Sequence, residues 1–410
     1  MRRSLLCVAL LSLLFGACDG AGVSVTPTID LTPLQTVEVS NGRFSIRLDD
    51  RSTVGRSRWL PEPGNPDLWV STFSLSGLWL AADQGPYRSN VGSVTPNAIS
   101  SFEFASTETE NIGIFVITKD SLESEILNWP VELGAPVEAD GTPQIYGDLM
   151  AWAAYQPATA PGVGVTSLSG VRVGVSLFMF VEEPLSNALF IRYDIRNTSN
   201  ETLSDLHIGY GADTDLLLYE RLGIECGRLA WNENQTGYDL DNHVTYTYVT
   251  PHPEDGSRPR ECYATVVGFS ILDMSSPNGL GGSKMAHRIL REKVYDSYPE
   301  FATTEITNSE HLRLALEGLS PSGDQMIDPT TGSPSRFAFT GDPVSKTGWL
   351  DQRIDVLSVQ SITPIDLAPG DERSITVAWL IAKGQNFETG LELFREQFDQ
   401  IMSRRDLWDF

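Results

Sequence analysis

Two pairs of aspartates, each with a spacing of two residues, are the side chains in this sequence best suited to bind a metal ion. They are Asp213 with Asp215 and Asp239 with Asp241, and Asn242 follows the second pair. Residues two apart at the end of a β-strand project to the same side, and calcium binds six to eight oxygens of this kind. We therefore expect a candidate calcium site here. The alternative is that these aspartates are solvated or hydrogen-bonded within turns.

Paired carboxylates could also hydrolyse glycosidic bonds, since a glycosidase uses an acid and a second carboxylate about 5–10 Å apart. With 54 Asp and Glu residues in a chain of 410, such pairs arise by chance, and the sequence selects none of them. The five histidines form neither an HExxH motif nor an i, i+4 pair. There is no G-x-S-x-G, P-loop or G-x-G-x-x-G motif. We therefore assign no catalytic residue.

Nine tryptophans are present, and exposed aromatic rings can stack on sugar rings. Trp79 and Trp379 lie in apolar segments and are expected in the core. Trp129 and Trp349 lie in segments that are typical of loops, so they are the candidate glycan contacts. The alternative is that these two rings anchor their loops to the core.

The first 18 residues have the pattern of an export signal. Arg2 and Arg3 precede a short apolar run, Leu5–Gly16, which is too short to span a membrane. The end of this segment, Leu14-Phe15-Gly16-Ala17-Cys18, resembles the bacterial lipobox, in which the cysteine is lipidated and becomes the mature N-terminus. Phe15 departs from the usual leucine. The alternative is an ordinary signal peptide cleaved after Ala17.

The lipobox resemblance implies an exported lipoprotein that is anchored to the membrane through Cys18 and faces the periplasm or the cell surface. Residues 19–34 are rich in Gly, Ser, Thr and Pro and are expected to form a flexible tether. No other apolar run is long enough to span a bilayer.

The remaining cysteines, Cys226 and Cys262, predict a disulfide, because the protein is expected in an oxidising compartment. Cys7 lies within the signal. Neither of the two later cysteines has a neighbour at zinc-ligand spacing.

The formal net charge of −25 argues against binding to nucleic acid, which requires a basic surface. Removal of Arg2 and Arg3 with the signal changes this charge from −25 to −27. The acidic surface is expected to be mainly solvated.

Many short strands are predicted, and the clearest signal is a pair around Asn197–Thr202. Leu189–Ile195 and Leu206–Tyr210 each alternate apolar and other residues, and the segment between them is rich in turn residues. We interpret this stretch as a hairpin that ends at Asp213. Asn41-Gly42, between alternating apolar residues, predicts a second hairpin. Further strands are expected within Trp69–Ala82, Ile112–Thr118, Ser169–Glu182, Thr245–Val249, Cys262–Leu272 and Ser374–Ile381.

Two segments favour helices. Ser309–Leu319 mixes the two periods, and Phe387–Met402 has apolar residues at helical spacing. Because almost no helix lies between the strands, the pattern favours a mainly β fold, a large antiparallel β-sandwich with few helices. Residues 35–385 are expected to form one large sandwich or two intimately packed ones, and residues 386–410 a C-terminal amphipathic helix and tail.

Several short segments together resemble a group of uncharacterised exported surface proteins of Bacteroidota, Ignavibacteria and neighbouring phyla. The resemblance implies a β-sandwich surface protein and no reaction. Many of these proteins carry a sorting domain for type IX secretion, which is not expected in this protein, and the Val137–Gly141 segment is shorter than their calcium-binding type of insert. The matching segments include Gly77-Leu78-Trp79, Leu133–Val137, Tyr146-Gly147-Asp148, Ala188–Asp215, Asp328–Gly332, Gly341–Val344, Gly348–Asp351 and Leu367–Asp371.

The sequence thus predicts an exported, lipid-anchored cell-envelope protein with a binding or structural role toward a carbohydrate or protein ligand. The alternative is a carbohydrate-active enzyme on a sandwich scaffold. A cleft with two facing carboxylates and an exposed tryptophan would favour the enzyme.

Overall fold

The computed structural model describes residues 36–49, 54–60, 69–72, 75–82, 85–88, 114–121, 126–155, 168, 170–214, 216–219, 234–251, 260–272, 286–290, 309–320, 322–351 and 357–408. The chain divides into two units, Met1–Leu34 and Gln35–Phe410, and all described residues belong to the second. The predicted signal, Cys18 and the tether lie outside the described residues, as do Asp215 and Cys226. No helix among the described residues is long and apolar enough to cross a membrane.

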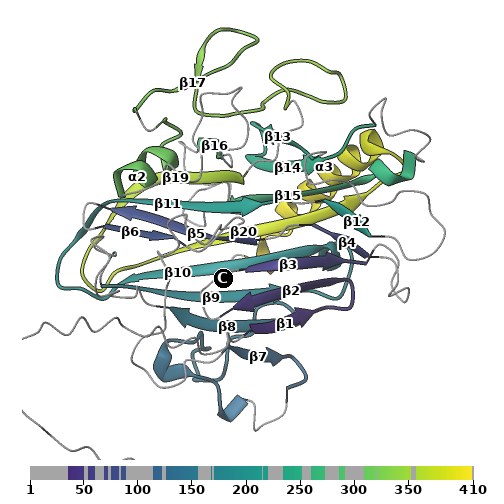
Figure 1. Ribbon diagram of the computed structural model, residues 1–410. Coiled ribbons are helices and arrows are strands. Elements are labelled where there is room, and N and C mark those ends of the chain that lie inside the picture. Colours follow the sequence, from purple (N-terminus) through teal and green to yellow (C-terminus); the bar gives the residue numbers. More distant parts are fainter. Residues whose placement is uncertain are drawn as a thin grey trace, which may run out of the picture. The chain divides into compact units, whose positions relative to one another are not determined.

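The described residues form two large antiparallel sheets (Figure 1). The central strands of the first sheet follow the order β1-β2-β3-β5-β11-β19-β16, and those of the second the order β13-β14-β15-β20-β10-β9-β8-β7. The first sheet contains β1 (Thr36–Ser40), β2 (Phe44–Asp49), β3 (Val54–Trp59), β4 (Trp69–Ser71), β5 (Leu75–Ala82), β6 (Gly85–Arg88), β11 (Leu203–Asp213), β12 (Leu217–Tyr219), β16 (Ala286–Leu290) and β19 (Leu357–Leu367).

The second sheet contains β7 (Phe115–Thr118), β8 (Leu149–Tyr155), β9 (Val171–Met179), β10 (Ala188–Asn197), β13 (Gln235–Asp239), β14 (Val244–Tyr248), β15 (Thr265–Leu272) and β20 (Glu372–Lys383). A separate small sheet pairs β17 (Met326–Ile327) with β18 (Pro334–Ser335). The predicted strands and the mainly β fold class are confirmed.

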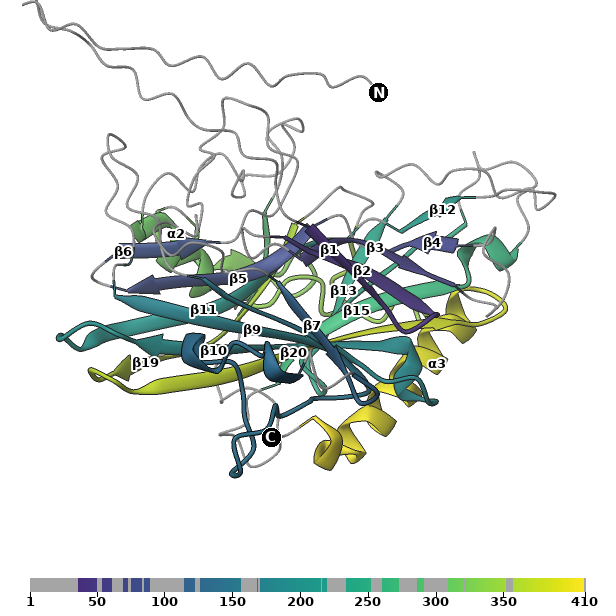
Figure 2. The same ribbon diagram turned by 90° about the horizontal axis from the view of Figure 1, so that it is seen from below.

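The helices also match the predicted segments. α2 spans Ser309–Leu316 and α3 spans Phe387–Ser403, and short 3₁₀ turns occupy Val131–Leu133 (η1), Leu185–Asn187 (η2), Arg260–Tyr263 (η5) and Arg405–Leu407 (η7). Asn386 and Thr389 form a capping box that satisfies free N–H groups at the start of α3. The apolar face of α3 packs on β15 and β20, as Figures 1 and 2 show. The buried residues of this face include the predicted set Leu391, Phe394, Phe398 and Ile401.

The hairpin predicted at Asn41-Gly42 is confirmed. Its turn lies one residue further along the chain than a turn with Asn41 and Gly42 as its two central residues. Ser40 pairs with Ser45, and the N–H of Asn41 donates to the carbonyl of Phe44. Gly42 is therefore the first of the two central residues. Its φ is +84°, and a positive φ at this position is what a type II′ turn requires.

The hairpin predicted at Leu189–Ile195 and Leu206–Tyr210 is wrong, although both strands exist. β10 pairs with β9 and β20 in the second sheet, whereas β11 pairs with β5 and β19 in the first. The segment between them crosses from one sheet to the other, which makes it an arch. The same is true of β19 and β20, which are consecutive in the chain and lie in opposite sheets.

The two arches lie side by side and are joined at their turns by Asn197. Its backbone N–H donates to Asp371 and its carbonyl accepts from Gly370. Its side-chain Nδ2 donates to the carbonyls of Glu201 and Leu367, both at 2.8 Å. One fully buried asparagine therefore fixes the position where both chains change sheets.

The sandwich core lies between the two sheets, where aromatic rings from both meet. Tyr210 on β11 contacts Tyr193 on β10 and Phe269 on β15, with ring centroids 6.1 and 5.4 Å apart. Its hydroxyl donates to Ser76 Oγ at 2.6 Å and accepts from Trp379 Nε1 at 3.1 Å. Because an unpaired buried hydroxyl is costly, this network helps fix the position of one sheet relative to the other.

Candidate binding site

Asp239 accepts hydrogen bonds within the turn that follows it. Asp239 Oδ1 accepts the backbone N–H groups of Asp241 and Asn242, at 2.9 and 3.2 Å, and its Oδ2 accepts from the Asn242 side chain at 3.3 Å. This is the turn interpretation that the sequence left open.

A calcium site is not assembled in the part of the chain that the structure describes. No three His, Cys, Asp or Glu side chains converge there in a group that could hold a metal, so Asp213 does not join Asp239 and Asp241. Asp215 lies outside the described residues, and metal binding at the end of β11 stays a prediction.

The two tryptophans predicted as glycan contacts are buried, so this prediction is wrong. Trp129 is 6% exposed. Its ring centroid lies 6.2 Å from that of Trp152, and its Nε1 donates to the carbonyl of Pro136 at 3.0 Å. Trp349 is 7% exposed and packs edge-on against Phe339. Trp129 holds its loop against the sandwich core, whereas Trp349 packs in a separate small cluster with Met326, Ala338 and Phe339. Neither ring offers a face to a sugar.

Cys262 lies in η5, is buried and is disulfide-bonded. Cys226 lies outside the described residues, so the pairing of Cys226 with Cys262 stays a prediction.

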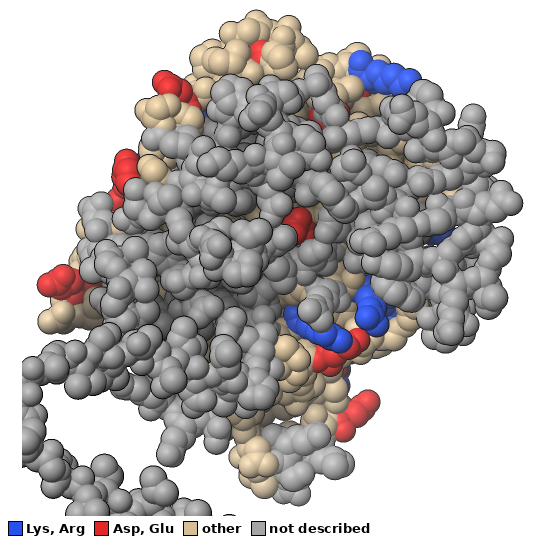
Figure 3. Space-filling view, in the orientation of Figure 1, with Lys and Arg blue, Asp and Glu red and all other residues tan. Residues whose placement is uncertain are grey.

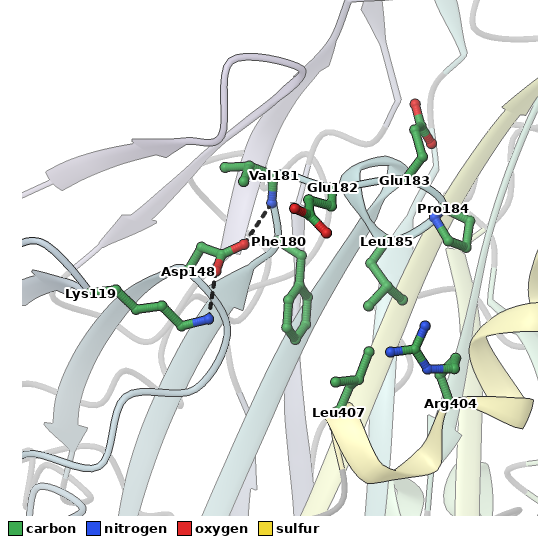
Figure 4. Close-up of a pocket in the computed structure, with 10 residues that line it drawn as sticks. All are labelled: Lys119, Asp148, Phe180, Val181, Glu182, Glu183, Pro184, Leu185, Arg404 and Leu407. Atoms are coloured by element: carbon green, nitrogen blue, oxygen red, sulfur yellow. Dashed lines mark hydrogen bonds and ion pairs between the residues drawn. The ribbon is translucent and has the colours of Figure 1, made fainter.

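A pocket of about 290 Å³ lies between the β9–β10 connection and the C-terminal segment that follows α3 (Figure 4). This volume is near the lower end of the range of ligand pockets, about 300–1,000 Å³. Apolar and charged side chains share its lining, which comprises Lys119, Asp148, Phe180, Val181, Glu182, Glu183, Pro184, Leu185, Arg404 and Leu407.

Packing beneath the pocket holds the Phe180 ring in place. Phe180 meets Phe178 and Phe190 edge-on, at centroid distances of 6.2 and 5.8 Å. In Figure 4 its ring points into the space between Asp148 on one side and Leu185 with Leu407 on the other. Phe178 and Phe190 are neighbours in the β9–β10 ladder, so the second sheet supports the ring from below.

Hydrogen bonds fix the two ends of the β9–β10 connection. Asn41, in the first hairpin, donates from Nδ2 to the carbonyls of Phe180 and Ser186, at 2.7 and 3.0 Å. Glu183 forms an ion pair with Arg43 and accepts from Asn187 Nδ2 at 3.0 Å. The Asn-Gly hairpin of the first sheet therefore positions the pocket wall on the second.

Asp148 is the best-held carboxylate of the pocket. Its Oδ1 lies 2.6 Å from Lys119 Nζ, and its Oδ2 accepts the backbone N–H of Val181 at 3.0 Å. Burial alone would raise the pKa of Asp148, but these two hydrogen bonds outweigh it and lower the pKa. Asp148 is therefore ionised at neutral pH and is poorly suited to donate a proton to a leaving group.

The outer face of the second sheet carries a line of charged residues, away from the pocket. Arg192 Nε lies 2.8 Å from Asp194 Oδ1, and Ser374 Oγ donates to the same oxygen. The guanidinium of Arg192 also lies 5.6 Å from the ring centroid of Tyr146. Burial raises the pKa of Tyr146 to about 12, so its hydroxyl stays protonated at neutral pH.

The acidic side chains of described residues are scattered over the face shown in Figure 3 and do not gather in one patch there. Sequence reasoning missed the pocket, whose one local signal is Glu182-Glu183-Pro184 between two strong strand patterns.

No family model matches the sequence, and no curated protein matches it. Among solved structures, the chain is similar to a putative aldose 1-epimerase from Escherichia coli K12, with 10% identity, a TM-score of 0.32, and coverage of 86% of this chain and 100% of the other. A galactose mutarotase-like protein from Clostridium acetobutylicum gives 8% identity, a TM-score of 0.32, and coverage of 85% and 95%.

A polysaccharide lyase gives 11% identity and a TM-score of 0.23, with coverage of 64% of this chain and 26% of the other. At these scores the likenesses carry no argument about activity or ligand.

Proposed function

We propose that the protein is an exported cell-envelope protein, anchored through a lipid on Cys18, that binds a small carbohydrate in the pocket above Phe180. The observation that carries this proposal is the composition of the pocket. A supported aromatic ring forms its floor, and fixed charged groups of both signs form its walls.

A sugar ring suits this lining because it has an apolar C–H face and a periphery of hydroxyls. Phe180 and Leu407 offer apolar surface, while Asp148, Glu182 and Arg404 offer acceptors and donors. Ligand sites in general combine a mainly apolar lining with a few polar groups that set orientation. The pocket volume of about 290 Å³ supports a ligand of one or two sugar rings.

Binding without turnover is the role that the carboxylates support. A glycosidase needs one carboxyl group with a raised pKa as its acid. The pKa of Asp148 is lowered instead, and Glu183 is engaged by Arg43 and Asn187. The signal-like segment that ends at Cys18, followed by a polar tether, supports the export and anchoring parts of the proposal.

The test is a glycan array with parallel hydrolysis assays on the soluble form that lacks residues 1–18. We expect a small sugar to bind without being cleaved. Arg404→Ala and Glu182→Gln should each weaken this binding about tenfold, since hydrogen bonds to charged groups contribute about 1.5–3 kcal/mol. Both side chains are exposed, so the fold should be retained.

Matched controls are Arg336→Ala and Glu201→Gln, two exposed residues outside the pocket lining. They should leave the affinity unchanged. Hydrolysis of the bound glycan, or an equal loss of affinity in controls and pocket variants, would contradict the proposal.

A further inference from the structure

Two arginines lie directly opposite each other on the outer face of the second sheet. Arg172 on β9 is the register partner of Arg196 on β10. Like charges in this position repel each other and destabilise a sheet. Such a pair is therefore a cost to the fold unless something neutralises it.

Neither guanidinium forms a side-chain hydrogen bond or an ion pair with the part of the chain that the structure describes. Asp194, an acidic neighbour on the same face, does not pair with either arginine, because Arg192 and Ser374 already bind its carboxylate. Glu372 is the register partner of Arg196 in the β10–β20 ladder and attracts its charge, but forms no ion pair with it. In a chain with 54 acidic and 29 basic residues, two adjacent arginines that form no ion pair among the described residues call for an explanation.

The Arg172 side chain is half-buried rather than free in solvent. Its guanidinium carbon lies 3.8 Å from the position that a Cβ of Gly134 would take. Gly134 has a φ of +87° and ends η1. Because glycine has no side chain, the loop backbone can lie close to Arg172 on the sheet. Burial and the neighbouring Arg196 both lower the pKa of Arg172.

We infer that Arg172 and Arg196 together form a binding site for an oxyanion, that is, a carboxylate, sulfate or phosphate group of a ligand. Two planar guanidinium groups side by side can each present two N–H donors to such a group. A bound oxyanion would remove the repulsion between them. Arg192 adds a third positive charge four residues from Arg196 on the same face of β10, although Asp194 balances it.

This site is separate from the pocket above Phe180. Arg172 lies near the start of β9 and Phe180 directly follows its end, a separation of roughly 26 Å at about 3.3 Å per residue. The oxyanion site therefore stands or falls independently of the proposed carbohydrate pocket.

The experiment compares thermal unfolding of the soluble form lacking residues 1–18 in sodium sulfate, sodium phosphate, sodium glucuronate and sodium chloride at equal ionic strength. For the unsubstituted protein, we expect at least one of the three oxyanions to raise the Tm by about 2 °C or more above chloride, because ligand binding to the native state stabilises it. A rise with all three indicates a general oxyanion site, and a rise with glucuronate alone indicates a sugar acid.

Arg196→Gln is the decisive variant, because Arg196 is exposed and its replacement should not disturb the core. It should abolish the oxyanion-specific rise in Tm. In chloride its Tm should exceed that of the unsubstituted protein, because the repulsion with Arg172 is gone. Arg172→Gln should behave in the same way, whereas Arg336→Gln, at an exposed arginine elsewhere, should retain the full rise.

The inference is overturned if none of the three oxyanions raises the Tm above chloride, or if the rise is the same in Arg196→Gln, since that would be a general salt effect. The pocket variant Arg404→Ala should keep the oxyanion response. A failure of carbohydrate binding is thereby distinguished from a failure of this site.

Discussion

Glu372 shows at the level of a single residue how the charges on the outer face of the second sheet compete. Burial raises the pKa of its carboxyl group, and the nearby charge of Asp194 raises it further. Arg196 and Arg192 act in the opposite direction but do not compensate. The ionised form of Glu372 is therefore less favourable in the folded protein than in the unfolded chain.

This predicts a pH-dependent effect of Glu372→Gln. A carboxyl group with a raised pKa in the folded state adds stability below its unfolded pKa, and that contribution is lost as the pH rises through the folded pKa. The variant should therefore have a higher Tm than the unsubstituted protein at pH 7, and the difference should shrink as the pH falls toward about 4. Thermal unfolding across this pH range measures it, with Glu201→Gln as the exposed control. A lower Tm of Glu372→Gln at pH 7 would contradict the assignment.

Single-residue roles were only partly predictable from the sequence. The turn interpretation of Asp239 could be written down in advance, because an aspartate two residues before a free backbone N–H is a common turn. The burial of Trp129 and Trp349 could not, because it depends on packing against Trp152 and Phe339, and no local sequence pattern shows these contacts. The pocket depends on residues from four separate segments, from Lys119 to Leu407.

At the level of elements, the arches explain why a correct strand prediction gave a wrong pairing. Alternating apolar residues around a turn-rich segment occur both in a hairpin and in an arch. The distinction lies in the neighbours, since β9 and β20 occupy both edges of β10 and leave no edge for β11. Of these two partners of β10, β9 is its neighbour in the chain, whereas β20 lies about 180 residues further along. No short sequence pattern reveals a partner at that distance.

Asn197→Ala should destabilise the sandwich by roughly 1–3 kcal/mol, because the buried carbonyl of Leu367 loses a donor. The carbonyl of Glu201 loses a donor as well, but it keeps its hydrogen bond from Ser199 Oγ. Urea unfolding of the soluble form measures the change. Asn200→Ala, three residues along in an exposed position, should change the stability by less than about 0.5 kcal/mol. Equal effects of the two substitutions would mean that Asn197 does not join the arches.

Gly390→Ala in α3 should be destabilising, although alanine is favoured over glycine within helices by about 0.5–1 kcal/mol. A Cβ at this position would collide with the backbone carbonyl of Ala264 and would also lie 3.4 Å from Val266 Cγ2. The helix would have to move off β15, so we expect a loss of about 1–3 kcal/mol, measured by urea unfolding. Glu392→Ala, on the exposed side of α3, serves as the control. A gain in stability for Gly390→Ala would show that α3 does not pack closely on β15.

For the whole molecule, the broad character was predictable because it depends on many residues at once. The mainly β class follows from many short alternating segments, and the small number of helices follows from the lack of helical period between them. The charge of −25 argues against binding to nucleic acid, which requires a basic surface. It does not reveal that Arg172 and Arg196 lie together, because only the register of β9 and β10 brings them opposite each other.

The predicted attachment of the whole molecule to a membrane depends on one residue, Cys18. If Cys18 is lipidated, the full-length chain expressed in a bacterial host should partition into the membrane fraction, and mass spectrometry should find a lipid-modified cysteine at the mature N-terminus. Cys18→Ser should move the protein to the soluble exported fraction without changing its thermal stability, since the sandwich begins only at Thr36.

Cys7→Ser serves as the control, because Cys7 lies within the expected signal and should not affect anchoring. A mature N-terminus that carries no lipid, or membrane association that survives Cys18→Ser, would contradict the anchor. Stable attachment needs a second signal, such as a second acyl chain, because a single acyl chain binds membranes only weakly. The mass of the modified N-terminal peptide therefore tests whether the attachment of this strongly acidic protein is strong enough to persist.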